Sequence, residues 1–151
     1  MSANHKADTF VVGVDGSVSS IEALRQAVWL AKPLGAQVEA LTCWNFPSVY
    51  EAPYALGTFD FEGAAQKILD AAIESAFGLD WPGNLTTHLL QGSARPALIE
   101  ASRDAALLVL GRRGFGGFRG LLMGSVSSAC TAHAHCPVLV VHASDAGAHD
   151  A

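Results

Sequence analysis

The sequence predicts an α/β protein, in which a parallel sheet carries helices on both of its faces. Five short apolar runs alternate with helix-like segments along the chain, in the order β-α-β-α-β-α-β-α-β. These runs are nearly continuous, which is typical of parallel strands that are buried on both sides. Such a doubly wound sheet binds its ligand at the carboxyl ends of the strands, where the strand order reverses.

Each predicted strand is an apolar run bounded by turn residues. The expected strands cover residues 9–14, 38–44, 85–90, 107–110 and 138–141. The segment at residues 45–60 contains Pro47, Pro53 and Gly57 and reads as a loop. A loop of this length in a compact domain usually has a function or is mobile.

The predicted helices are marked by capping residues and by apolar positions at helical spacing. Ser19 and Glu22 have the spacing of a capping box at the start of the first helix. The other expected boundaries are Pro33 and Gly35 closing the first helix, Asp60 and Gly78 around the second, Ser93 before the third, and residues 126–134 for the fourth. The positions expected to be buried are Ile21, Leu24, Val28 and Ala31 in the first helix, Phe61, Ala65, Ile68, Ala72 and Ala76 in the second, and Ala97, Leu98 and Ala101 in the third.

Composition and charge favour one ordinary domain. Half of the 151 residues are apolar, so we expect a single domain over residues 1–151, with residues 1–8 and 144–151 as frayed tails. The net charge of −5 argues against a nucleic-acid partner, because no basic patch is available to neutralise phosphates. We also expect no membrane contact and no signal peptide, since no apolar run has the necessary length. Three irregularly spaced cysteines suggest reduced thiols and a cytoplasmic location.

A glycine-rich loop joins the fourth predicted strand to the last helix. Gly111, Gly114, Gly124 and Ser125 define the spacing Gly-x2-Gly-x9-Gly-Ser. Glycines allow the backbone to approach a ligand closely, and a helix N-terminus attracts an anion. The loop therefore predicts phosphate binding. It contains no Gly-Lys-Ser/Thr, and no Gly-x-Gly-x-x-Gly follows the first strand, which disfavours a Walker A site and binding of NAD or FAD.

These residues resemble the universal stress protein family. The resemblance covers nearly the whole chain and is carried by residues 12–17 (Val-Gly-Val-Asp-Gly-Ser), by the glycine signature, by residues 124–127 and by residues 135–141. It implies a five-stranded parallel sheet in the order 3-2-1-4-5, the Rossmann-like fold of adenine nucleotide α-hydrolases. It also implies a homodimer, and ATP binding in members that keep the signature. This chain keeps every signature position.

The resemblance also implies roles for individual residues. Asp15 is expected to contact the ribose or a bound Mg²⁺, and Cys43 to offer a main-chain contact to adenine. Asp15 also has a simpler interpretation as a turn cap. The full set of expected nucleotide-binding residues is Gly13, Val14, Asp15, Cys43, Gly111, Arg112, Arg113, Gly114, Gly116, Gly117, Gly124, Ser125, Val126 and Ser127. The pattern does not decide which of Arg112, Arg113 and Arg119 reaches a phosphate.

The last predicted strand is the expected dimer interface. It is apolar on both faces but lies at the sheet edge in the implied order, and pairing with a second copy would cover that edge. Its residues are Val138, Leu139, Val140 and Val141. A zinc site at Cys130, His133, His135 and Cys136 is disfavoured, because the spacing matches no common zinc pattern, so core packing is the better interpretation.

Three functions remain open at this stage. The favoured one is an ATP-binding stress regulator that is not an enzyme, with at most slow hydrolysis, because no Gln or Glu is evidently placed to position an attacking water. The second is a weak ATPase or AMP-releasing enzyme of the α-hydrolase-like group. Residues 15–18 disfavour it, because such enzymes usually carry a Ser-Gly-Gly-rich loop there. The third is a dimeric interaction module without a nucleotide.

Overall fold

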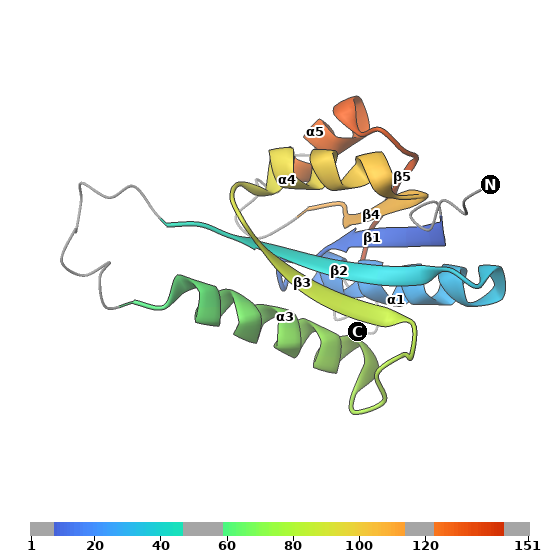
Figure 1. The fold of residues 1–151 in the computed structure, drawn as a ribbon, viewed down its shortest axis with the longest axis horizontal. Helices are drawn as coiled ribbons and strands as arrows, with labels where there is room; N and C mark the ends of the chain where they lie inside the picture. Colours follow the sequence, from blue (N-terminus) through green and yellow to red (C-terminus); the bar gives the residue numbers. More distant parts are fainter. Residues whose placement is uncertain (1–7, 47–58, 114–122, 144–151) are drawn as a thin grey trace, which may run out of the picture.

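The computed structural model describes residues 8–46, 59–113 and 123–143. Its centre is a five-stranded parallel sheet with the strand order β3-β2-β1-β4-β5, as the resemblance implied (Figure 1). The strands are β1 (Thr9–Gly13), β2 (Gln37–Trp44), β3 (Leu85–Gln91), β4 (Leu107–Gly111) and β5 (Val138–Val141). All five lie where apolar runs predicted strands, with differences of one residue at the ends of β1, β2, β3 and β4.

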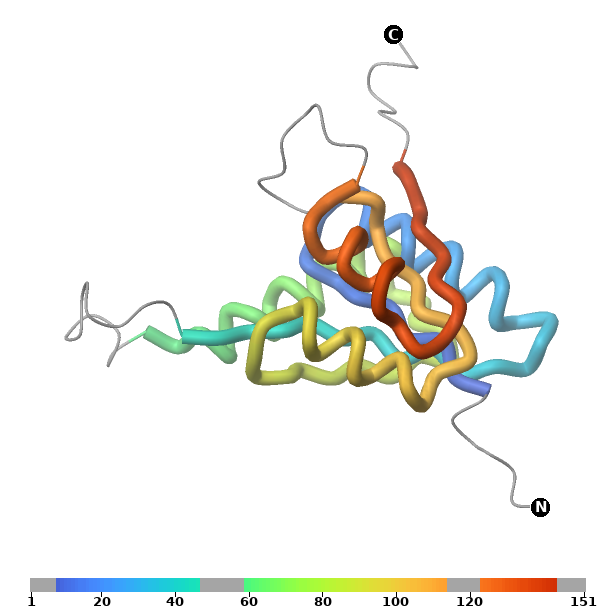
Figure 2. Tube along the Cα trace, turned by 90° about the horizontal axis from the view of Figure 1, so that it is seen from above, coloured from blue at the N-terminus to red at the C-terminus, as the bar shows by residue number. Residues whose placement is uncertain are grey.

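Helices cover both faces of this sheet, as predicted. The helices are α1 (Val18–Leu34), α3 (Phe61–Phe77), α4 (Ala94–Ala101) and α5 (Ser125–His133), and a short 3-10 turn, η3 (Ser102–Asp104), follows α4. The pair α1 and α3 lies on one face, and α4 and α5 lie on the other (Figure 1). Figure 2 shows α4 and α5 next to each other above the sheet, where they are in contact. Within the described ranges, no helix has the length and apolar character that crossing a membrane requires.

The sheet separates two hydrophobic cores. On the α1 and α3 side, alternate strand residues such as Val12 and Val38 pack against Leu24, Leu69 and Ile73. The α4 and α5 side is built from the intervening strand positions, and includes Val11, Leu41, Leu108, Leu98 and Cys130. Strands buried on both faces explain why the apolar runs in the sequence are continuous.

The predicted start of α1 was wrong. Ser17 is the N-cap residue, with an extended backbone (φ −70°, ψ 159°), and its hydroxyl accepts a hydrogen bond from the Ser20 N–H. Ser19 already lies inside the helix, and Glu22 bonds to Arg25 rather than reaching back to a cap. Pro33 also lies inside α1, and the helix ends at Gly35, which has a left-handed conformation (φ 66°).

The second predicted helix is confirmed in place, and Ala65 and Ala72 of its predicted buried face are buried. Asp60 caps α3, since its Oδ1 accepts from the Gly63 N–H at 2.9 Å. Ile68 was expected in the core but is 43% exposed, and Leu69 and Ile73 are buried in its place. Ser93 stands at the N-cap of α4 without a side-chain capping bond. The predicted tails, apart from Asp8, and most of the loop at residues 45–60 lie outside the described residues.

Candidate functional site

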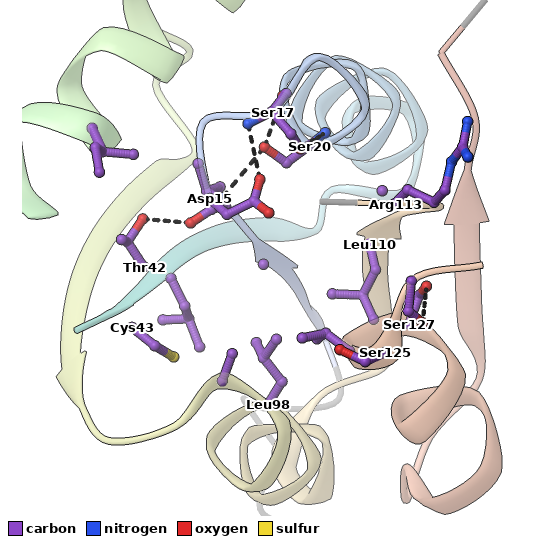
Figure 3. Close-up of a pocket in the computed structure, with 18 of the residues that line it drawn as sticks. Asp15, Ser17, Ser20, Thr42, Cys43, Leu98, Leu110, Arg113, Ser125 and Ser127 are labelled. Atoms are coloured by element: carbon purple, nitrogen blue, oxygen red, sulfur yellow. Dashed lines mark hydrogen bonds between the residues drawn. The ribbon is translucent and has the colours of Figure 1, made fainter. Parts of the chain in front are cut away.

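A cavity of about 510 Å³ lies at the carboxyl ends of β1, β2 and β4 (Figure 3). This is the point where the strand order reverses, because β1 has β2 on one side and β4 on the other. The chain leaves the sheet in opposite directions at such a point, so a crevice opens between the two connections. The position is the one predicted from the order of the elements.

The structure brings most of the predicted site residues together around this cavity. Those that line it are Gly13, Val14, Asp15, Cys43, Gly111, Arg113, Gly124, Ser125, Val126 and Ser127. Arg112 is not among the lining residues. Gly114, Gly116, Gly117 and Arg119 lie outside the described residues. The predicted lining residues come from four separate stretches of the sequence, 13–15, 43, 111–113 and 124–127, which meet in the folded chain.

Sequence reasoning missed about half of the cavity wall. The lining residues not predicted are Ser17, Ser20, Leu41, Thr42, Ala65, Ile68, Ala94, Leu98 and Leu110. The serines follow Asp15 within five positions, so their place could have been found from the turn itself. The side chains from α3 and α4 carry no such local signal. They reach the cavity because their helices pack beside β2.

The turn after β1 is held by its own side chains. Asp15 Oδ1 accepts from the Ser17 N–H at 2.9 Å, and the Ser20 hydroxyl accepts from the Asp15 N–H at 3.3 Å. The same hydroxyl donates to the Ser17 carbonyl at 3.0 Å. Gly16 has a φ of 86°, which favours glycine at this point of the turn. Asp15 therefore does cap its turn, and it stays exposed at the cavity.

The neighbouring strand β2 fixes the end of β1 from the other side. The Thr42 hydroxyl, which is buried, donates to the Val14 carbonyl at 2.8 Å, and the Val14 N–H donates to the Leu41 carbonyl at 2.8 Å. The ends of β1 and β2 thus remain joined beyond the last residue pair of the sheet. In Figure 3, Thr42 and Cys43 lie on one side of the cavity, and Ser125 and Ser127 lie on the other.

The start of the glycine signature is tied to its end. The Arg112 carbonyl accepts two hydrogen bonds, from the Gly124 N–H and from the Ser127 hydroxyl, both at 2.7 Å. The Arg112 N–H donates to the Val141 carbonyl at 2.6 Å. The main chain of Arg112 thus brings the two described ends of the signature together beside the cavity.

The N-terminus of α5 opens onto the same place. Its N-cap residue is Gly124, which provides no side-chain cap, and the first-turn residues Ser125, Val126 and Ser127 line the cavity. The first N–H groups of a helix have no partner within the helix, and they carry its positive dipole end. Together with the Arg113 side chain, they make this end of the cavity suitable for an anion.

The opposite end of the cavity is mainly apolar. Leu41 and Cys43 line the cavity on the β2 side, across from Ser125 and Ser127 (Figure 3), and the side chains from α3 and α4 that line it are Ala65, Ile68, Ala94 and Leu98. Burial raises the pKa of the Cys43 thiol, so the sulfur is a neutral, weakly polar surface at ordinary pH. One end of the cavity thus suits an apolar group, and the other suits a negative charge.

A resident metal ion has few candidate ligands here. Among the residues that the structure describes, no three His, Cys, Asp or Glu side chains are grouped to hold a metal ion. Cys130 is buried against the sheet, in the core on the α4 and α5 side. Asp15 is the one carboxylate among the described lining residues, so any cation here would need ligands from a bound molecule or from water.

Comparison with known proteins now identifies the family. A family model described as the universal stress protein family matches residues 6–142. The chain belongs to this family. Universal stress protein Rv2623 of Mycobacterium tuberculosis is 31% identical over 154 residues, covering 96% of this chain and 51% of the relative. Rv1996 of the same species is 34% identical over 161 residues, with coverages of 93% and 50%. The chain thus spans about half the length of the curated relatives it matches.

Solved universal stress proteins share the fold. UspA from Lactobacillus plantarum superposes with a TM-score of 0.75 at 21% identity, covering 89% of this chain and 97% of that chain. A universal stress protein in complex with cAMP has a TM-score of 0.58 at 29% identity, with coverages of 91% and 98%. The universal stress protein from Archaeoglobus fulgidus in complex with dAMP has a TM-score of 0.62 at 21% identity, with coverages of 88% and 96%.

Proposed function

We propose that this universal stress protein domain binds ATP with Mg²⁺ and acts as a nucleotide-dependent regulator of the stress response. One observation carries the proposal: the cavity joins an apolar wall, built from β2, α3 and α4, to the N-terminus of α5, whose first N–H groups suit an anion. A nucleotide has the matching chemistry, with a flat base at one end and phosphates at the other. Two solved relatives are complexes with adenine nucleotides, cAMP and dAMP, which supports adenine as the base.

The chemistry of the wall suggests how ATP would lie. The base fits between Leu41, Cys43 and Leu98, and the phosphates fit at the first turn of α5 and Arg113. Asp15 lies beside Ser17 and Ser20 at the turn after β1 (Figure 3), and from the cavity wall it can accept from a ribose hydroxyl or hold Mg²⁺ bound to the phosphates. Mg²⁺ usually keeps several waters and binds through one or two carboxylates plus phosphate oxygens, so a single Asp is sufficient.

Calorimetry and mass spectrometry test the proposal. Protein denatured directly after purification should release ATP, and nucleotide-free protein should bind MgATP in a titration. Gly124→Val should abolish binding, because a branched side chain at the N-cap occupies space beside the first-turn N–H groups. Gly83→Val is the matched control, since Gly83 lies in an exposed turn and a Cβ added there would have no other atom within 4 Å. Unchanged ATP affinity in Gly124→Val would overturn the assignment of this cavity.

We further propose that the bound ATP is a ligand and that hydrolysis is very slow. Phosphoryl transfer needs a residue that positions the attacking water, and the described cavity wall contains no Glu or Gln. A weak ATPase or AMP-releasing enzyme remains the alternative. Steady-state turnover of about 1 per second or faster, abolished by Asp15→Ala, would favour that alternative over the regulator.

A homodimer through β5 belongs to the same proposal. β5 is an edge strand, and Val138, Leu139 and Val140 remain only half-buried in the single chain. Pairing β5 with a second copy would satisfy its free edge and cover these side chains. Light scattering at micromolar concentration should show a dimer, and Val140→Lys should give a monomer or insoluble protein. A monomer for the unmodified chain would contradict this interface.

We propose a cytoplasmic location and no nucleic-acid partner, on the grounds of thiol content and charge.

A further inference from the structure

We propose that Ser19 and Ser127 are positioning residues. Their hydroxyl groups hold Arg112 and Arg113, at the start of the glycine signature, in the conformation that binds phosphate. The inference rests on the proposed function, since it concerns the phosphate end of the same cavity. It assigns a role to Ser19, which the sequence placed at a helix cap. It also specifies the role of Ser127, which was expected among the nucleotide-binding residues.

Ser127 holds the carbonyl group of Arg112, the first of the two residues concerned. Its hydroxyl donates to the Arg112 carbonyl at 2.7 Å, and it also lies 3.3 Å from the Gly124 carbonyl. The residue is only 2% exposed. A hydroxyl has one proton to donate, and here that proton is directed at main-chain carbonyls. Ser127 can still offer its main-chain N–H to a phosphate, because that group lies in the first turn of α5.

Ser19, in α1 on the opposite face of the sheet, holds the carbonyl group of Arg113. Its hydroxyl donates to the Arg113 carbonyl at 2.6 Å, although the two residues are 94 positions apart. The contact requires α1 to lie very close to the end of β4, and Gly111 makes this possible. A Cβ at Gly111 would lie 2.7 Å from the Ser19 carbonyl carbon and 2.8 Å from the Ser20 nitrogen.

The two hydroxyls therefore clamp one short piece of chain between two helices. The Arg112 carbonyl is tied to α5, the Arg113 carbonyl is tied to α1, and these helices lie on opposite faces of the sheet (Figure 1). Because a peptide group is planar, fixing a carbonyl also fixes the N–H of the same group. The clamp thus fixes the peptide groups that follow Gly111 in the signature, and with them the position of Arg113 at the cavity. Donors that are already oriented bind a phosphate at a lower entropic cost.

Paired titrations with MgATP and adenosine test this inference. Ser19→Ala and Ser127→Ala should each weaken MgATP binding about fivefold to tenfold, the effect of losing one orienting hydrogen bond. Adenosine affinity should stay unchanged, because adenosine has no phosphate to reach the clamped segment. Ser19→Thr keeps the hydroxyl and should bind MgATP like the unmodified protein. Ser128→Ala is the matched control, since Ser128 is the exposed neighbour of Ser127 on the same helix.

The double variant separates positioning from direct contact. If both hydroxyls hold one segment, Ser19→Ala with Ser127→Ala should lose less ATP affinity than the product of the two single losses. A loss equal to that product, an equal loss for adenosine, or unchanged ATP affinity in both single variants would overturn the inference.

Limited proteolysis in the absence of nucleotide tests the clamp independently of ligand binding, because it measures how accessible Arg112 and Arg113 are to trypsin. Trypsin should cut after Arg112 or Arg113 faster in both alanine variants than in Ser128→Ala. Equal cleavage rates would refute the clamp even if ATP binds as proposed. Conversely, if the unmodified protein binds neither MgATP nor adenosine, the proposed function fails, while faster cleavage in the variants would still show the clamp.

Discussion

The turn after β1 and the chain after β4 enter the same cavity, but different kinds of contacts hold them. In the turn, Asp15, Ser17 and Ser20 bond to one another within five positions of sequence. After β4, the Arg112 and Arg113 carbonyls bond to residues that are 15 and 94 positions away. The turn is thus a local structure, whereas the segment after β4 depends on the packing of α1, α5 and β5.

This difference has consequences for both folding and function. A turn closed by its own side chains can form as soon as α1 forms, since its contacts close only short loops of chain. The segment after β4 takes its conformation only when both faces of the sheet are covered. A change in packing far from the cavity can therefore alter the anion-binding end without altering the turn that carries Asp15.

The largest effect is expected from closing the space between β4 and α1. Gly111→Ala places a Cβ against the Ser19 and Ser20 backbone, which cannot rotate away. We expect a loss of about 3 kcal/mol in the free energy of unfolding, and loss of ATP binding. Gly13→Ala is the comparison, because its Cβ meets the Leu110 and Leu98 side chains at 2.7 and 3.0 Å. Those side chains can shift, so the expected loss is only about 1 kcal/mol.

Urea denaturation of both variants checks this order. Equal losses for Gly111→Ala and Gly13→Ala would show that the approach of α1 to β4 is no tighter than ordinary core packing. Loss of ATP binding in Gly111→Ala with full stability would show a local effect on the ligand alone.

The same contrast explains how much the sequence could predict. Continuous apolar runs predicted the strands, and the capping position of Asp60 was visible because its partner is Gly63, three positions away. Ser19 was assigned to a helix cap from spacing alone, since nothing nearby reveals a bond to Arg113. Leu98 and Ile68 were missed as cavity residues, because their positions follow from how α4 and α3 pack. Local contacts can be predicted from local patterns, and contacts across the fold cannot.

Removing the hydroxyl at the centre of the turn should have the next largest effect. Ser20 is 3% exposed, accepts from the Asp15 N–H and donates to the Ser17 carbonyl. Ser20→Ala leaves both groups without that partner, and we expect a loss of roughly 1–2 kcal/mol in the free energy of unfolding. Because the turn is local, trypsin cleavage at Arg112 should not change. Faster cleavage there would show that the two regions are coupled.

Asp15 should matter more for the ligand than for stability. Asp15→Asn keeps an oxygen that can accept from the Ser17 N–H, so stability should stay within about 0.5 kcal/mol of the unmodified protein. The variant removes the one carboxylate among the described lining residues. Titrations with and without Mg²⁺ should then show that Mg²⁺ no longer strengthens ATP binding. Unchanged Mg²⁺ dependence would place the cation elsewhere.

The smallest effect concerns Cys43, which belongs to neither region and so reports on the cavity they share. Burial raises the pKa of the Cys43 thiol above its ordinary value of 9.0. The thiolate is the reactive form, so alkylation of Cys43 by iodoacetamide should be slower at pH 7 than alkylation of an exposed thiol, and it should accelerate as the pH rises. Saturating ATP should slow the alkylation of Cys43 further, because Cys43 lines the cavity.

Cys136 is the internal control. Burial also raises the pKa of its thiol, but Cys136 lies outside the cavity wall. ATP should therefore leave the alkylation of Cys136 unchanged. Equal protection of both thiols would point to a general tightening of the protein rather than a nucleotide beside Cys43.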